Sequence, residues 1–388
     1  MVNGVLYDRT TDFTDWHDQR RARALERIRA LLRDRDLTGV VLTRPGAVSW
    51  AGGAMNPPID RTASEDVVWL AVGAETVAVI TTTVERDRIE AELLPAGADL
   101  VAVPWWDPEL LVSAASEALG AAAADLGSDG HRGFGVDLEH ELTAARLVLS
   151  AAEQDELRAL GADAAGAVEH ALRNWRPGAL DTEVAAEIVG RVEAGGGDAP
   201  VVIVGADARV QRFRHPLARG VPTERLVMAV LVARRHGLHV ALTRYAASGP
   251  TAELDLQLAA VRRIHRRALE SGRPGRSYGQ LYGALDAAYR EAGHAEAWQG
   301  HYQGGPIGYG QREFELAPCQ TGSPWWPVPI AAGAALALNP SLPGGAKDED
   351  TFLITEAGPE LMTTTNDWPV ADEINPPRPA ILRCGGDR

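Results

Sequence analysis

The sequence predicts a two-domain chain, an α/β domain over residues 1–150 followed by a domain of long helices and strands over 151–370. The length of 388 residues is about twice that of a usual single domain. In the first part, short apolar runs alternate with helical stretches. Near residue 151 the pattern changes to long amphipathic helices and a hairpin. The last residues, 371–388, are rich in Pro and Gly and are expected to be a surface tail.

The first domain is expected to begin with a helix over residues 16–36, where Ala, Leu and Ile recur at helical spacing between charges. Short runs rich in Val and Ile predict the strands of one sheet, at residues 39–43, 67–73, 76–82, 100–105 and 133–138. Helical stretches at 84–94 and 109–124 alternate with these runs. Such alternation is typical of an α/β layer domain.

The second domain is expected to open with a long amphipathic helix from residue 151 that ends before Pro177-Gly178. Asp181 is a good N-cap for the next helix, which should end at the three glycines 195–197. The remaining elements follow in sequence order: strands at 200–204, 226–233 and 238–244, then helices at 251–271 and 278–292.

Composition excludes several classes of protein. With 45% apolar and 23% charged residues the chain is an ordinary globular protein, and its net charge of −15 disfavours nucleic acid or an anionic membrane as a partner. No apolar run of 18 residues and no signal-peptide pattern is present, so a cytoplasmic location and no membrane contact are expected. The two cysteines, Cys319 and Cys384, form neither a disulfide framework nor a zinc pattern.

Three motifs in the second domain occur in an informative order. They are GLHVALTR (residues 237–244), HYQGGPIGYGQRE (301–313), and an Asn-Pro turn (339–340) followed by GGAKDEDTFLITEAGPELMT (344–363). In this order they resemble the creatinase/aminopeptidase P/methionine aminopeptidase family, peptidase M24. The resemblance implies an α/β N-terminal domain plus an α+β pita-bread C-terminal domain.

Metal-dependent members of that family hold two metal ions, and the resemblance places their ligands at five positions of this chain. Those positions carry Val230, Ala241, Gly305, Asn339 and Glu349. Hard divalent ions need several carboxylate or imidazole ligands that converge on one point. One carboxylate and one neutral amide cannot hold a dinuclear site, so we expect no metal and no other cofactor.

The residues that remain suit acid–base chemistry. By resemblance, His215, His301 and Glu349 are the catalytic candidates; imidazole suits the role because its ordinary pKa near 6.5 lets it exchange a proton at neutral pH. Six further residues are candidates for substrate binding: Arg312, Lys347, His239, Tyr309, Glu313 and Arg61. Structural readings stay open: His215 could be a surface loop residue, and Glu349 a buried strand acid held by Lys347 or Arg312.

The resemblance leaves several functions open. Creatinase-like members lack metal and use a His to activate water, which implies hydrolysis of a C–N bond in a small amidine, guanidino, amide or amino-acid-derived substrate. The same base could run an elimination, as a lyase. A non-catalytic binding protein is a further alternative, and an Xaa-Pro metallopeptidase is disfavoured by the lost ligands. Creatinase-like dimers also imply a homodimer with sites near the interface, where the loop 52–61 would bring Arg61 to a neighbouring site.

Overall fold

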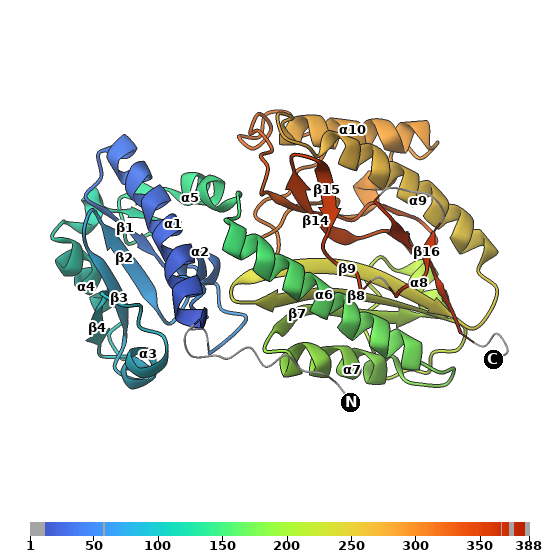
Figure 1. Ribbon diagram of the computed structural model, residues 1–388, viewed down its shortest axis with the longest axis horizontal. Helices are drawn as coiled ribbons and strands as arrows, with labels where there is room; N and C mark the ends of the chain where they lie inside the picture. Colours follow the sequence, from blue (N-terminus) through green and yellow to red (C-terminus); the bar gives the residue numbers. More distant parts are fainter. Residues whose placement is uncertain (1–11, 57–58, 366, 372–375, 385–388) are drawn as a thin grey trace. The chain divides into compact units, whose positions relative to one another are not determined.

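The computed structural model describes residues 12–56, 59–365, 367–371 and 376–384. The chain divides into two compact units, one up to Arg146 and the other from Leu147 onward. Each unit has its own layers of helices and strands (Figure 1). Within the described residues, no helix is both long enough and apolar enough to cross a bilayer.

The N-terminal unit is built around one six-stranded sheet in the order β4-β3-β2-β1-β5-β6. Its strands are β1 (Gly39–Leu42), β2 (Trp69–Gly73), β3 (Val77–Thr82), β4 (Asp99–Val103), β5 (Gly127–Ser128) and β6 (Val136–Asp137). The three strands β1, β2 and β3 are almost wholly buried, which explains why they appear in the sequence as unbroken apolar runs.

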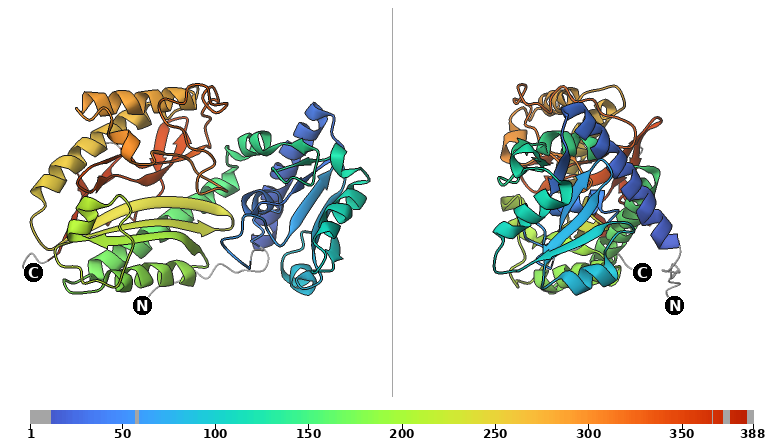
Figure 2. Two further views of the ribbon diagram at one scale, coloured as in Figure 1. Left: turned by 180° about the vertical axis from the view of Figure 1, so that it is seen from behind. Right: turned by 90° about the vertical axis from the view of Figure 1, so that its left-hand side faces the viewer.

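Helices flank this sheet (Figure 2). They are α1 (Asp12–Arg35), α2 (Pro45–Ala51), α3 (Arg86–Glu92), α4 (Glu109–Leu119), the short 3₁₀ helix η1 (Ala123–Asp125) and α5 (Glu139–Arg146). Helix α4 packs Ala115 and Leu119 into a core that also contains Val41, Ala71 and Ile80. The predicted α/β layer domain is therefore present, although α2, β5 and α5 were not anticipated.

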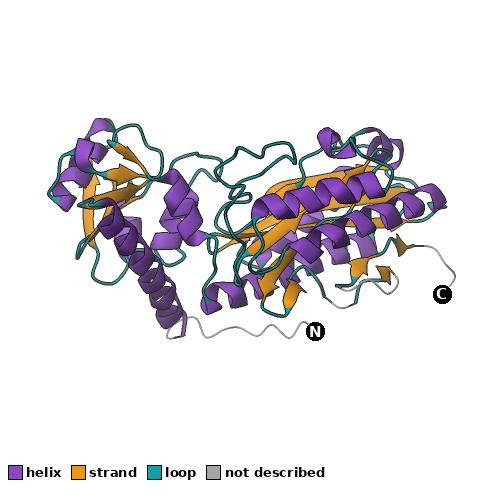
Figure 3. Cartoon of the chain, turned by 90° about the horizontal axis from the view of Figure 1, so that it is seen from above, coloured by secondary structure: helices purple, strands orange, loops and turns teal. Residues whose placement is uncertain are grey.

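The C-terminal unit begins with two helices that cover one sheet, in which β7, β8 and β9 are antiparallel and β18 joins β9 in parallel. The sheet has the order β18-β9-β8-β7, and α6 and α7 lie against one of its faces (Figures 1 and 3). These elements are α6 (Ala151–Asn174), α7 (Asp181–Ala194), β7 (Asp198–Ala206), β8 (Leu226–Arg235), β9 (Leu238–Ala247) and β18 (Leu382–Arg383). Ser150 and Glu153 form a capping box at the start of α6, which fixes where the unit begins.

The second half of this unit repeats the arrangement of two helices over a sheet, here β10-β11-β14-β15. The helices are α9 (Ala252–Ser271) and α10 (Tyr278–Glu291), and the strands are β10 (Gly304–Pro306), β11 (Ala335–Leu338), β14 (Asp350–Thr355) and β15 (Gly358–Leu361). Smaller elements are α8 (Asp207–Arg212), η2 (Ala297–Gly300), the pair β12 (Ser341–Leu342) and β13 (Ala346–Lys347), and the pair β16 (Val370–Ala371) and β17 (Arg378–Pro379).

Two sequence-based expectations are corrected. The strand expected at 133–138 is only the two residues of β6, because Phe134 turns into the core instead of extending the strand. The segment 371–388 was expected to be a surface tail, but its described part packs into the unit. Arg378 and Ile381 are 1% and 4% exposed, and β18 pairs with β9. Burial of these side chains stabilises the packed segment despite its high Pro and Gly content.

Candidate active site

Glu349 lies between β13 and β14, and its carboxylate is held by one residue of β9 and one residue that follows β11. Thr243 on β9 donates its hydroxyl hydrogen to Oε2 at 2.8 Å, and the Asn339 side chain donates to Oε1 at 3.2 Å. Arg312 Nη2 is 3.6 Å from Oε1. The side chain is buried, at 2% exposure. Glu349 is thus a fixed acceptor that faces a cation.

His215 and His301 come together from distant loops. Their ring centroids are 5.0 Å apart, with the rings tilted by 47°. Both line a cavity of about 580 Å³, together with residues that the sequence reasoning did not single out: Arg214, Trp298, Gln303, Glu315 and Leu316. His215 is exposed, whereas His301 is half-buried. The structure therefore brings together the two histidines that the sequence placed 86 positions apart.

The two histidines differ in protonation. Burial, together with the cation of Lys347, lowers the pKa of His301 to about 3. Its Nδ1 faces the carbonyl oxygen of Tyr302, which can only accept, so Nδ1 carries the proton and Nε2 is an unprotonated acceptor. That Nε2 is buried with no partner among the described atoms. His301 is therefore a neutral hydrogen-bond acceptor across the physiological pH range.

The pKa of His215 is lowered as well. Partial desolvation and the Lys347 cation lower its pKa below 6.5, while the Glu349 carboxylate partly offsets them. His215 is thus mostly neutral at pH 7 and can accept a proton, and it is the histidine that reaches solvent. Of the pair, only His215 has the properties of a general base.

Lys347 completes the charged part of the site. It is 4% exposed, and its ammonium group makes one long hydrogen bond, 3.5 Å, to the carbonyl oxygen of Arg214. Burial lowers the pKa of Lys347, Glu349 raises it, and Arg214 and Arg312 lower it further. A buried ammonium group that makes only one long hydrogen bond suits an anionic group of a ligand.

Three other candidates, like Glu349, Lys347 and Arg312, are not among the residues that line the cavity. His239 is buried and donates from Nδ1 to the Gly308 carbonyl oxygen at 2.9 Å. Tyr309 is buried and donates its hydroxyl hydrogen to Glu153 on α6 at 2.5 Å. Glu313 accepts from the Gly310 amide at 2.9 Å. These contacts give all three a role in holding the loop 308–313. Arg61 is exposed in the N-terminal unit, and its contact with a substrate remains a prediction.

A buried ionic network supports Glu349, and the sequence reasoning missed it. Arg378 donates to both oxygens of Asp348 at 2.9 and 2.8 Å and pairs with Asp350 at 2.9 Å. His265 donates from Nδ1 to Asp348 at 2.9 Å. Burial alone would raise the pKa of Asp348, but Arg378 and His265 outweigh it and hold the pKa far below its usual range. The acidic run 348–350 in a buried strand was the available signal.

The residues at the family's metal positions do not fit a metal. Val230 and Ala241 are buried apolar side chains. A Cβ added at Gly305 would lie 2.5 Å from the Phe314 carbonyl oxygen and 2.9 Å from the Tyr282 hydroxyl, so no side chain fits there without a backbone shift. Across the described ranges, no three His, Cys, Asp or Glu side chains gather as a metal centre would require.

Comparisons with known proteins agree with this architecture. The chain has the fold of the prolidase from Pyrococcus horikoshii, with a TM-score of 0.72 at 17% identity over 88% of this chain and 98% of that one. The dipeptidase PepE from Mycobacterium ulcerans gives 0.71 at 21% identity, over 95% and 98% of the two chains. The N-terminal domain of the FACT complex subunit SPT16 from chickpea gives 0.64 at 11% identity, over 91% and 97%.

The architecture is the pita-bread fold, with a mixed α/β N-terminal domain and an α+β C-terminal domain. The model of metallopeptidase family M24 matches residues 155–356, more than half of the chain. The protein belongs to this family, as its motifs indicated. No curated protein sequence matches it.

Proposed function

We propose that the protein is a metal-independent enzyme that cleaves a C–N bond in a small amidine, guanidino, amide or amino-acid-derived substrate. The observation that carries the proposal is the pair formed by His215 and His301 at the cavity, with ring centroids 5.0 Å apart. The five family metal positions, by contrast, offer only one carboxylate, Glu349, and one neutral amide, Asn339.

In the proposed reaction His215 acts first as base and then as acid. It takes a proton from water while the water oxygen adds to the trigonal carbon of the substrate. The C–N bond then breaks, and protonated His215 returns the proton to the leaving nitrogen. Glu349 stabilises the imidazolium form, because its negative charge raises the pKa of His215.

Substrate binding follows from the other groups of the site. His301 Nε2 and the carboxylate of Glu349 accept hydrogen bonds, so they suit N–H groups of the substrate. Lys347 and Arg312 suit a substrate carboxylate, since both keep donors that the described residues leave free. We expect a small zwitterionic or acidic substrate rather than a polymer.

Elimination by the same base is the nearest variant, because His215 could remove a carbon-bound proton instead of a water proton. Binding without catalysis is the other alternative. Products distinguish these outcomes: hydrolysis incorporates ¹⁸O from labelled water, elimination leaves an unsaturated product without label, and a binding protein gives ligand saturation without turnover.

The test is a turnover screen with matched variants. Candidates are guanidino acids, amidines, amides and Xaa-Pro dipeptides, and release of ammonia or amine is measured. His215→Gln should lower kcat by about 10²–10⁴-fold, the usual contribution of a general acid–base group. The exposed His294→Gln variant should retain the wild-type rate. Equal rates for His215→Gln and wild type would remove His215 as the base, and cleavage confined to Xaa-Pro dipeptides with added Mn²⁺ would favour a metallopeptidase.

A further inference from the structure

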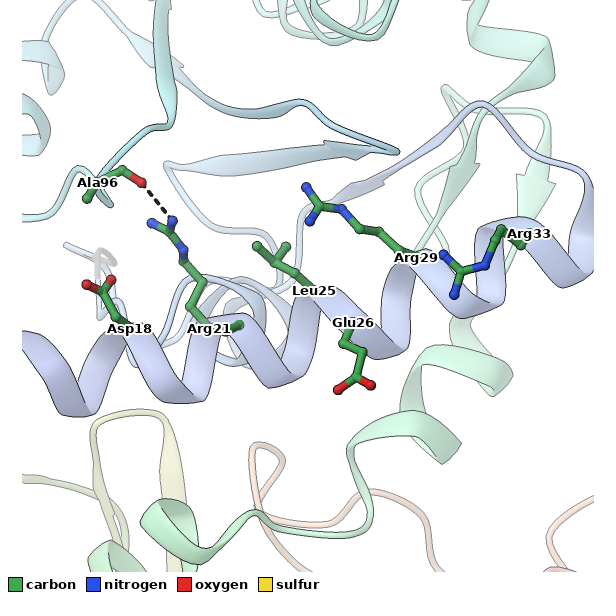
Figure 4. A pocket seen from close by; sticks show the side chains of 8 residues that line it. Asp18, Arg21, Leu25, Glu26, Arg29, Arg33 and Ala96 are labelled. Carbon is green, nitrogen blue, oxygen red and sulfur yellow. Dashed lines mark hydrogen bonds between the residues drawn. The ribbon is translucent and has the colours of Figure 1, made fainter.

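A groove of about 570 Å³ lies along one face of α1 in the N-terminal unit, outside the site described above. Figure 4 shows three arginines spaced along the helix, with Leu25 between the first two. The residues that line the groove are Asp18, Arg21, Ala22, Leu25, Glu26, Arg29, Arg33 and Ala96.

The groove arginines differ from other arginines of the same helix. Arg23 pairs with Glu26 at 2.5 Å, and Arg35 pairs with Glu141. None of Arg21, Arg29 and Arg33 forms an ion pair with a carboxylate in the described part of the chain. The groove therefore contains three guanidinium groups without a direct carboxylate partner, in a protein with 53 acidic and 38 basic residues.

Two of these guanidinium groups are fixed in place by the backbone. Arg21 Nη2 donates to the Ala96 carbonyl oxygen at 2.7 Å, and Arg29 Nε donates to the Gly73 carbonyl oxygen at 3.2 Å. Neutral carbonyl groups orient the cations without neutralising them. Donors held in this way lose little side-chain entropy on binding, so the groove is preorganised for an anion.

The spacing along the helix limits the shape of the ligand. At 1.5 Å per residue, Arg29 and Arg33 are about 6 Å apart along the axis, and Arg21 is about 12 Å from Arg29. One anionic group can therefore bridge Arg29 and Arg33, while only an extended ligand also reaches Arg21. Asp18 and Glu26 line the same groove and repel any anion, so a ligand must pair with several of the arginines at once to offset this repulsion.

We infer that the α1 groove binds an extended oligophosphate, with one end between Arg29 and Arg33 and the other at Arg21. Phosphate suits these groups because its oxygens accept bidentate hydrogen bonds from guanidinium groups, and because each phosphate adds charge along the chain. The net charge of −15 opposes the approach of such a ligand. Binding must therefore depend on these local cations and weaken as salt is added.

Isothermal titration of the full chain with orthophosphate, pyrophosphate and tripolyphosphate tests this assignment. Affinity should rise with chain length, by about tenfold or more from orthophosphate to tripolyphosphate, since only the longer chain reaches Arg21. Arg21→Gln should remove this gain and leave orthophosphate binding unchanged. The double variant Arg29→Gln/Arg33→Gln should abolish binding of all three phosphates.

Arg35→Gln is the matched control, because it removes the same charge from the same helix, and neither Arg35 nor its partner Glu141 lines the groove. It should leave the affinity for tripolyphosphate unchanged. Citrate, which is compact and carries carboxylates, should bind at least about tenfold more weakly than tripolyphosphate. Absence of tripolyphosphate binding at low salt, an equal loss in Arg35→Gln and Arg21→Gln, or citrate binding as tight as tripolyphosphate would overturn the inference.

Discussion

His215 and His301 lie with their ring centroids 5.0 Å apart, so an exposed imidazole faces a half-buried one. Burial is the main cause that lowers the pKa of each ring, and Lys347 lowers both further. In the proposed reaction the two residues have separate tasks: His215 exchanges the proton, and His301 accepts a hydrogen bond.

The pH dependence of the reaction should reflect His215. Because its pKa in the folded protein lies below 6.5, His215 is unprotonated and active above that pH and becomes protonated as the pH falls. We therefore expect the acidic limb of kcat/KM to lie below pH 6.5. A Lys347→Met variant, which removes a cation that lowers this pKa, should move the limb to higher pH. If the acidic limb of kcat/KM lies at the same pH in Lys347→Met as in the wild type, Lys347 does not have this electrostatic role.

Stability should also depend on pH through His239. Burial lowers the pKa of His239 to about 4, below its unfolded value near 6.5. The unfolded chain therefore binds this proton first, and stability falls as the pH drops from 6.5 towards 4. Between pH 7 and pH 5 the loss from this residue is about 2 kcal/mol.

Urea unfolding at pH 7 and pH 5 measures the effect of His239. In a His239→Gln variant the difference in unfolding free energy between the two pH values should shrink by about 2 kcal/mol. The exposed His294 serves as the control position. An unchanged difference in His239→Gln would mean that His239 does not titrate as its burial implies.

Much of the fold was predictable because the hydrophobic patterns match the elements closely. The runs that predicted β1 to β4 and the helical spacing that predicted α6, α7, α9 and α10 all lie within a few residues of the observed bounds. Two-residue strands such as β5 and β6 could not be predicted, because two residues are too few to show a periodic hydrophobic pattern. Position in the motif order indicated His215 and His301, whose rings lie together, but the roles of these residues and of Glu349 remain predictions.

The support of Glu349 could not be predicted, because it joins residues far apart in the sequence. Arg378 lies in a Pro- and Gly-rich segment that carries no periodic signal, yet it is buried against Asp348 and Asp350. Sequence composition cannot show which of many arginines neutralises a buried acidic run. Arg378 itself lies on the two-residue strand β17, which pairs with β16.

Removal of Arg378 should therefore destabilise the protein strongly. Arg378→Met leaves Asp348 and Asp350 without their shared cation, and breaking a buried ion pair typically costs about 3–5 kcal/mol. Arg383→Met is the matched control, because Arg383 is half exposed and pairs with Asp255 at 2.6 Å on the surface, where such a pair contributes about 0–1 kcal/mol. Chemical denaturation compares the two; similar losses would show that the Asp348 network is not a buried charge cluster.

We also expect a homodimer, from the resemblance to creatinase-like members. Arg61, in an exposed loop, is the residue proposed to reach a neighbouring subunit's site. Multi-angle light scattering at micromolar concentration should give twice the chain mass of 41.4 kDa, and Arg61→Gln should raise KM while leaving the fold intact. A monomer with full activity would exclude this arrangement.

Catalysis without metal by His215 is the central claim, and turnover by chelator-treated protein tests it most directly. Purified protein is dialysed against a chelator, its metal content is measured by mass spectrometry, and the rate on the substrate from the screen is compared before and after. We expect far less than one metal equivalent per chain and a rate that chelation leaves unchanged and His215→Gln abolishes. Two equivalents of Mn, Co, Zn or Fe, with activity lost on chelation and restored by the metal, would contradict it.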